Sequence, residues 1–355
     1  MKHGRFITAL FASFLFSCTS EAANPVIVPT VVQELQQKNF ASIIPGNYSG
    51  ITRISNNRYA VVDDKSASDG FYFFDIQTDS ISGEIQSATM SELITNGNTN
   101  RDSEGIVYVP SSNTLFISGE ADKRILEYNM DGSLTGRELQ ISKIYSSALP
   151  NSNFEALAYN PKMHLFWTTT ESTLPTDGEQ SSSVNGVKNK LRIQSFDENM
   201  QPVHQYAYLM DAPVSTKNSS PYAMGVSEIT ALDDGQLIVL EREFVIPPSK
   251  IGAYVNCKLY VIHPDEGEQL KDEEPLNDSS PFLKKTELCQ FKTSLTLTKN
   301  QIANYEGMCL GTTLTNGNQS LLLVSDSQNH YAGVLKDWFK VIIISENGTV
   351  AKTLE

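Results

Sequence analysis

One short phrase recurs along the chain, and it constrains the fold more than any other feature of the sequence. Four copies contain a glutamate just before a short apolar run, namely Glu104, Glu155, Glu228 and Glu306. A fifth copy, Tyr48 to Ile54, has Ser49 and Gly50 in place of the glutamate. In every copy a turn and a second apolar run follow. Two short apolar runs joined by a turn are typical of a β-hairpin, so the sequence predicts five hairpins.

Each predicted hairpin also has an acidic residue at its far end. Asp234-Gly235 and Asn316-Gly317 mark two of the turns, because these dipeptides favour tight hairpin turns. Folding a hairpin at its turn brings its first polar residue close to its closing acid. A lone acid at a strand end is usually a solvated side chain, whereas five copies in register favour a shared site. The expected pairs are Ser49 with Asp64, Glu104 with Glu120, Glu155 with Glu171, Glu228 with Glu241, and Glu306 with Asp326.

Two more strand-like segments follow each hairpin, so that every repeat has four strands. After the third hairpin these are Lys190 to Phe196 and Val203 to Met210, and after the fifth they are Phe339 to Ser345 and Thr349 to Leu354. A self-similar, all-strand repeat of about 50 to 80 residues indicates a β-propeller. We therefore expect an all-β protein with five visible four-stranded blades in one domain, residues 46–355.

The number of blades stays open at this point. A sixth blade could lie in the insert between Pro264 and Lys299, or use the lead-in segment, residues 24–45. The apolar stretch Val26 to Leu35 in that lead-in could also be an extra strand that closes the ring.

The first 23 residues have the features of a signal peptide. A basic start precedes an apolar run from Phe6 to Phe16, which is too short to span a bilayer. Leu15 to Cys18 resembles a bacterial lipobox, which would make Cys18 the lipidated first residue of the mature chain. Ser20 to Ala22 offers an ordinary cleavage site as the alternative. We expect an extracytoplasmic protein: a lipoprotein of the outer membrane or periplasm, held to the membrane only by its lipid, or a secreted protein.

The net charge and the cysteine content limit the classes of partner that the protein can bind. The net charge of -14 argues against nucleic acid or anionic lipid, and it suits a monomer that binds cations. Cys257 and Cys289 lie in successive strand-like segments, so a disulfide and two buried free thiols are both open. Cys309 lies in an apolar run and is expected in the core. No cysteine spacing resembles a zinc site.

The recurring acids predict a metal site at one end of the central channel. The innermost strand of each blade lines that channel, so the first polar residues of the repeats should converge there. Carboxylates so close together raise one another's pKa or require a cation, and Ca²⁺ takes 6–8 oxygen ligands. The predicted calcium ligands are Glu104, Glu155, Glu228, Glu306 and Ser49. The closing acids Asp64, Glu120, Glu171, Glu241 and Asp326, with Arg242, would form an outer, substrate-binding ring.

Arg242 can be interpreted in two ways, since it follows an acid directly. It could pair with an acid, or it could clamp a phosphate or carboxylate of the substrate. No nucleophile motif such as G-x-S-x-G is present, so the catalytic residues stay unknown. Among the histidines only His330 lies near a closing acid. Metal-assisted hydrolysis needs only oxygen ligands and a cation.

Three phrases carry a resemblance to a known family. N-F-E-A-L-A-Y, D-S-E-G-I-V-Y and V-S-E-I-T-A-L-D-D-G-Q-L-I-V-L-E-R-E resemble the phytase-like family, also called esterase-like activity of phytase, over about Ser49 to Leu323. The segment Glu228 to Arg242 is the most specific part. The resemblance implies a propeller, an extracytoplasmic location and phosphoesterase or esterase activity. The chain lacks the basic cluster with which propeller phytases bind their anionic substrate.

Two hypotheses follow. The first is an enzyme, a calcium-dependent hydrolase of phosphoric or carboxylic esters that acts on a small anionic or ester substrate at the channel mouth. The second is a non-catalytic surface propeller that binds a ligand or a protein partner.

Overall fold

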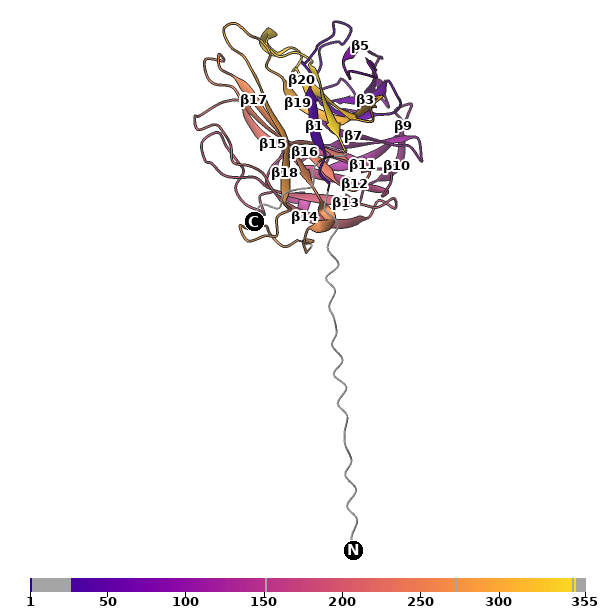
Figure 1. The fold of residues 1–355 in the computed structure, drawn as a ribbon, viewed down its shortest axis with the longest axis vertical. Coiled ribbons are helices and arrows are strands. Elements are labelled where there is room, and N and C mark those ends of the chain that lie inside the picture. The colour runs from indigo at the N-terminus through magenta and orange to yellow at the C-terminus, as the bar shows by residue number, and fades with distance from the viewer. Residues whose placement is uncertain (2–26, 151, 272, 347, 349–355) are drawn as a thin grey trace.

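The computed structural model describes residues 1, 27–150, 152–271, 273–346 and 348, and this part of the chain is almost entirely strand and loop (Figure 1). The predicted signal peptide lies outside these residues apart from Met1, and so do Cys18 and both cleavage sites. Among the described residues, no helix has the length and apolar character needed to cross a membrane.

The strands form five sheets of the same design, each built from segments consecutive in the sequence. Blade one contains β2 (Tyr48–Arg53), β3 (Arg58–Asp63), β4 (Gly70–Thr78) and β5 (Ile85–Met90), with the short β6 (Ile94–Thr95) paired to β4. Blade two contains β7 (Ser103–Val109), β8 (Thr114–Gly119), β9 (Arg124–Asn129) and β10 (Leu134–Glu138). Blade three contains β11 (Phe154–Asn160), β12 (Leu165–Thr170), β13 (Lys190–Phe196) and β14 (Pro202–Leu209).

The last two blades repeat the pattern. Blade four contains β15 (Tyr222–Ala231), β16 (Leu237–Val245), β17 (Tyr254–Ile262) and β18 (Lys285–Ser294). Blade five contains β19 (Asn304–Thr313), β20 (Gln319–Asp326), β21 (Phe339–Ser345) and β1 (Thr30–Glu34). Three short 3₁₀ helices, Lys143–Ser147, Pro264–Glu266 and Tyr331–Gly333, lie in the described connections.

The five first strands close into a ring. In order, β2, β7, β11, β15 and β19 each contact the next, and β19 contacts β2. Apolar side chains fill the space between adjacent blades, as where Trp167 of blade three and Val239 of blade four share one core cluster. The predicted five-bladed propeller is therefore confirmed. The insert from Pro264 to Lys299 supplies β18 of blade four rather than a sixth blade.

The N-terminal lead-in closes the ring. β1 pairs antiparallel with β21, with Thr30 opposite Ser345 and Val31 opposite Ile344. In Figure 1 the indigo β1 accordingly lies beside the yellow strands of blade five. The prediction that Thr349 to Leu354 supplies this outer strand is wrong, because β1 already occupies the free edge of β21. Residues 349–354 themselves lie outside the described residues.

The disulfide interpretation of Cys257 and Cys289 is also wrong. The two strands are neighbours, but Cys289 lies opposite Leu259 and Cys257 lies opposite Phe291. The cysteines are thus diagonal neighbours, about 7–8 Å apart, whereas bridged cysteines usually have Cα atoms about 5.5–6 Å apart. Both are free thiols, and Cys309 is buried and free as predicted.

Candidate functional site at the channel mouth

A one-residue irregularity near the start of each inner strand shapes the site. In β11, Phe154 lies opposite Thr170 and Ala156 opposite Thr169, so Glu155 is an extra residue in the pairing. Equivalent shifts occur in β2, β7, β15 and β19. Such β-bulges turn a side chain out of the regular alternation of the strand. The same device therefore sets the direction of one side chain in every blade.

The pairing defines which residues are equivalent. The bulge positions, which we call the inner ring, are Ser49, Glu104, Glu155, Ser227 and Glu306. The residues that directly follow their hairpin partners, which we call the outer ring, are Asp64, Glu120, Glu171, Arg242 and Asp326. Nine of these ten residues were predicted as site residues, and the pairing of each acid with its inner-ring partner holds in four blades.

Blade four differs from the prediction by one residue. The extra residue in β15 is Ser227, because Val226 lies opposite Glu241 and Glu228 lies opposite Leu240. Glu228 therefore corresponds to the small residues Gly50, Gly105, Ala156 and Gly307 of the other blades. The sequence analysis missed Ser227. In each blade an apolar residue lies two positions after the bulge, and aligning Ile229 with Leu157 and Met308 would have identified Ser227.

Glu228 contacts the backbone of the channel wall instead of the other carboxylates. Its Oε1 accepts hydrogen bonds from the amides of Leu157, at 3.0 Å, and Ile229, at 2.9 Å. The side chain is almost fully buried, and burial raises its pKa although these amide bonds lower it. The prediction that Glu228 faces the acids of the mouth is therefore wrong. This carboxyl group satisfies the free amides of inner strands, which have no further strand to pair with.

Glu241 does not belong to the outer ring either, because it lies opposite Val226 and the outer-ring position is the next residue. Its carboxylate accepts hydrogen bonds from the Tyr208 hydroxyl at 2.7 Å and the Asp211 amide at 3.1 Å, and it pairs with Lys285 at 2.5 Å. Tyr208 lies in β14 of blade three, Lys285 in β18 of blade four, and Asp211 in the connection between these blades. The place predicted for Glu241 is taken by Arg242.

Arg242 brings one positive charge into the two rings. Its guanidinium donates to Glu171 at 2.5 Å and to Glu306, and Nη1 also donates to Asn304 at 3.0 Å. The side chain is only 4% exposed, so the pairs lie in a largely dehydrated environment. The remaining charged positions of the rings are seven carboxyl groups, which one arginine cannot neutralise.

Burial and mutual repulsion raise the pKa values of these acids. The pKa of Glu104 is raised by burial and by the charges of Asp64 and Glu306, and that of Glu155 by burial and by Glu104 and Glu171. Burial raises the pKa of Asp64 to about 6 and that of Glu306 to about 7, in the latter case outweighing the nearby arginine. The mouth thus favours protonated carboxyl groups or an added cation.

Two buried polar atoms of the ring residues have no hydrogen-bond partner among the described residues. They are Oδ1 of Asp64 and Nε of Arg242. The other oxygen of Asp64 pairs with Lys65 at 3.0 Å, and Lys65 also contacts Asp102. No three His, Cys, Asp or Glu side chains of the described residues are arranged closely enough to hold a metal ion as they stand. An ion at the mouth would require the side chains to turn toward it.

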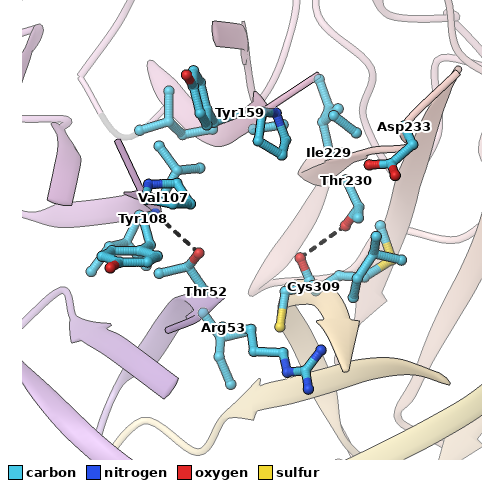
Figure 2. A pocket seen from close by; sticks show the side chains of 18 residues that line it. Thr52, Arg53, Val107, Tyr108, Tyr159, Ile229, Thr230, Asp233 and Cys309 are labelled. Carbon is cyan, nitrogen blue, oxygen red and sulfur yellow. Dashed lines mark hydrogen bonds between the residues drawn. The ribbon is translucent and has the colours of Figure 1, made fainter. Parts of the chain in front are cut away.

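The opposite end of the channel is chemically different. A cavity of about 190 Å³ lies there, and every blade contributes inner-strand residues to its wall. Figure 2 shows the labelled side chains around this hollow, with Arg53 and Asp233 as its charged members and Thr52 and Thr230 already bonded to neighbouring backbone. The walls are mainly apolar. The acidic chemistry is therefore confined to the mouth that carries the two rings.

The raised pKa of Glu120 predicts a pH dependence of stability. Burial raises this pKa to about 7 in the folded protein, although the Asn153 amide bond at 2.9 Å opposes the shift. The folded state then binds a proton that the unfolded chain has released, so stability falls as pH rises from 4.5 to 7. At 1.36 kcal/mol per pH unit the group accounts for about 3 kcal/mol.

Urea unfolding of the metal-free protein at pH 5, 6, 7 and 8 measures this effect. Glu120→Gln keeps an acceptor for Asn153 but cannot ionise, so we expect it to be more stable than the wild type at pH 8 and to show a flatter profile. The exposed Glu92→Gln serves as the control. A Glu120→Gln profile parallel to that of the wild type would contradict the assignment.

Comparison with known proteins agrees with this description. The sequence pattern of the family described as "Phytase-like: Esterase-like activity of phytase" matches residues 44–328. None of the curated proteins compared with the chain matches it.

Solved structures resemble the chain only distantly. A member of the duf4221 family from Bacteroides vulgatus has 9% identity and a TM-score of 0.39, covering 90% of this chain and 98% of that one. A virginiamycin B lyase from Staphylococcus aureus has 13% identity and a TM-score of 0.34, covering 86% and 98%. The periplasmic gluconolactonase of Pseudomonas aeruginosa has 12% identity and a TM-score of 0.31, covering 68% and 88%. The match over residues 44–328, the five repeats and the propeller together establish that the chain belongs to the phytase-like family.

Proposed function

We propose that the protein is an extracytoplasmic, calcium-dependent hydrolase of phosphoric or carboxylic esters that acts at the acidic channel mouth. The observation that carries this proposal is the buried excess of carboxyl groups there, with Oδ1 of Asp64 left without a hydrogen-bond partner among the described residues. Membership of the phytase-like family supports an esterase-like or phosphatase-like activity in general terms.

The carboxylate chemistry of the mouth suits a hard cation, provided that the side chains turn toward the ion. Asp64, Glu104, Glu155, Glu306 and Asp326 would hold Ca²⁺, which prefers carboxylate oxygens and tolerates irregular geometry. Glu228 leaves the predicted ligand set because its carboxyl group bonds backbone amides. A bound Ca²⁺ would supply positive charge that polarises an ester oxygen.

The remaining mouth residues have roles of their own. Arg242 holds Glu171 and Glu306 in place and brings positive charge to where an anionic substrate group would bind. Carboxyl groups whose pKa lies near 7, as for Glu120, can exchange a proton with substrate or water at neutral pH. A small ester with an anionic group therefore suits the mouth better than a long polyanion, since the rings contain a single arginine.

One observation favours the non-catalytic alternative. Arg242 is already engaged by Glu171, Glu306 and Asn304, which is how a purely structural arginine would be satisfied. A propeller of that kind would bind a ligand or partner at the mouth without turning it over.

Hydrolysis of chromogenic phosphomonoesters, phosphodiesters and short acyl esters, each with calcium or with a chelator, separates the two. We expect calcium-dependent turnover that Asp64→Asn reduces by at least tenfold, while the exposed Asp75→Asn leaves it unchanged. If purified wild-type protein loaded with calcium hydrolyses none of these esters, the enzymatic proposal is wrong.

A further inference from the structure

A histidine and an aspartate form a pair on the same face as the acidic mouth. Nε2 of His330 lies 2.8 Å from Oδ2 of Asp337, whose side chain is only 5% exposed, whereas that of His330 is 42% exposed. An ionised aspartate can only accept hydrogen bonds, so it fixes the proton of neutral His330 on Nε2. Nδ1, which has no partner among the described residues, then carries the free lone pair.

The loop that presents His330 is held in an unfavourable backbone conformation. Gln328, Asn329 and His330 have φ values of 47°, 51° and 57° in succession, and Ala332 follows at 53°. Residues with a Cβ atom rarely adopt this left-handed region, and each one costs free energy. Three consecutive cases persist only where surrounding contacts impose them, and such conformations cluster at functional sites.

The contacts that impose this conformation tie the loop to the outer ring. The Ser327 hydroxyl and the Asn329 amide both donate to the carbonyl of Gly46, at 2.9 Å and 3.2 Å. Ser327 directly follows the outer-ring residue Asp326, whose carboxylate accepts the Gln328 amide at 2.6 Å. The loop is thus anchored at the rim of the mouth.

The other anchor lies in blade one. Gly46 is followed by Asn47, whose carbonyl accepts the amide of the outer-ring residue Asp64 at 3.1 Å. Asp337 reaches the same segment, since its Oδ1 lies 3.4 Å from the Gly46 amide. Asp337 also lies close to Tyr48, since its charge adds to the burial that raises the pKa of the Tyr48 hydroxyl. The loop that carries His330 is therefore held next to the segments of the outer-ring residues Asp326 and Asp64.

We propose that His330, held by Asp337, is the general base of the ester hydrolysis at this mouth; this rests on the proposed function. Nδ1 accepts a proton from water as the water oxygen bonds to the carbonyl carbon or phosphorus of the substrate. The bond from that atom to the alcohol oxygen breaks, and the departing alcohol takes up the proton that Nδ1 had accepted, which returns His330 to its neutral form. Asp337 is a positioning residue, which keeps the ring oriented and stabilises its charged form.

The test compares His330→Gln and Asp337→Asn with a matched pair elsewhere. His164 forms the same kind of contact, with its Nδ1 2.8 Å from Glu198, but it lies in the turn before β12, at the other end of blade three. We expect His330→Gln to lower kcat about 100-fold with little change in KM, in the range typical of general bases. His164→Gln and Glu198→Gln should leave kcat unchanged.

The split between kcat and KM, together with rescue by added imidazole, separates a base from a merely structural residue. Imidazole should restore part of the kcat of His330→Gln, and Asp337→Asn should lower kcat with little change in KM. Melting temperatures and calcium affinities of the variants check that fold and ion site are intact. Wild-type turnover with an unchanged kcat in His330→Gln would overturn this inference and leave the proposed function standing. Absence of turnover in the calcium-loaded wild type would overturn both.

Discussion

Arg242→Met is expected to destabilise the folded protein by about 3–5 kcal/mol at pH 8, the usual cost of removing one partner of a buried ion pair. The variant leaves Glu171 and Glu306 without their cation in a site where Glu104, Glu155 and Asp326 already have raised pKa values. Methionine has a similar length and fills the space, so the loss reports on charge rather than on a cavity. Urea unfolding of the metal-free protein measures it.

Arg58→Met is the matched control, because Arg58 forms an ion pair with Asp75 in which both side chains are about half exposed. Exposed pairs contribute about 0–1 kcal/mol, so this variant should unfold almost like the wild type. The loss in Arg242→Met should also shrink at pH 5.5, since protonated carboxyl groups no longer need a cation. A loss below about 1 kcal/mol at pH 8 would show that the carboxyl groups at the mouth are protonated or solvated without the arginine.

Glu228→Ala is expected to cost on the order of 4 kcal/mol, because it leaves at least two buried backbone amides without an acceptor and each such group costs about 1–3 kcal/mol. The amides are those of Leu157 and Ile229. Glu228→Gln keeps an acceptor oxygen and should lose far less. Chemical unfolding of both variants at pH 7 gives the comparison.

Calcium binding provides the second readout for these variants. If Glu228 acts only on the channel wall, Glu228→Gln should bind calcium as tightly as the wild type does. A clear drop in calcium affinity in Glu228→Gln would contradict this placement and return the residue to the ligand set.

The propeller could be predicted from the sequence because its signal is repeated. Each hairpin combines two apolar runs with a turn such as Asp234-Gly235, and five such units in order leave few other folds. The closing strand was harder to predict. Both Val26 to Leu35 and Thr349 to Leu354 are apolar enough to pair with β21, and only the three-dimensional arrangement of the ring decides in favour of β1.

Most residues of the two rings could be predicted from the sequence, and the prediction was wrong only in blade four, where the strand pairing is shifted by one residue. In V-S-E-I the glutamate matches the glutamates of the other repeats, so the sequence was aligned on Glu228. The bulge falls on Ser227 instead, and this shift of one residue places Arg242 rather than Glu241 at the mouth. A β-bulge depends on how the hairpin pairs, which single residues do not reveal. The amide bonds of Glu228 and the pairing of His330 with Asp337 join residues from different strands and loops, so no local pattern contains them.

Calorimetric titration of chelator-treated wild-type protein with calcium at pH 7.5 tests whether the mouth is a calcium site. We expect saturable binding of one Ca²⁺ at the mouth and a rise in melting temperature, since a ligand held 100-fold above its Kd adds about 2.7 kcal/mol of stability. Asp64→Asn should weaken binding, and the exposed Asp75→Asn should not. No heat of binding and no thermal shift at millimolar calcium would contradict the calcium site and, with it, the proposed hydrolase.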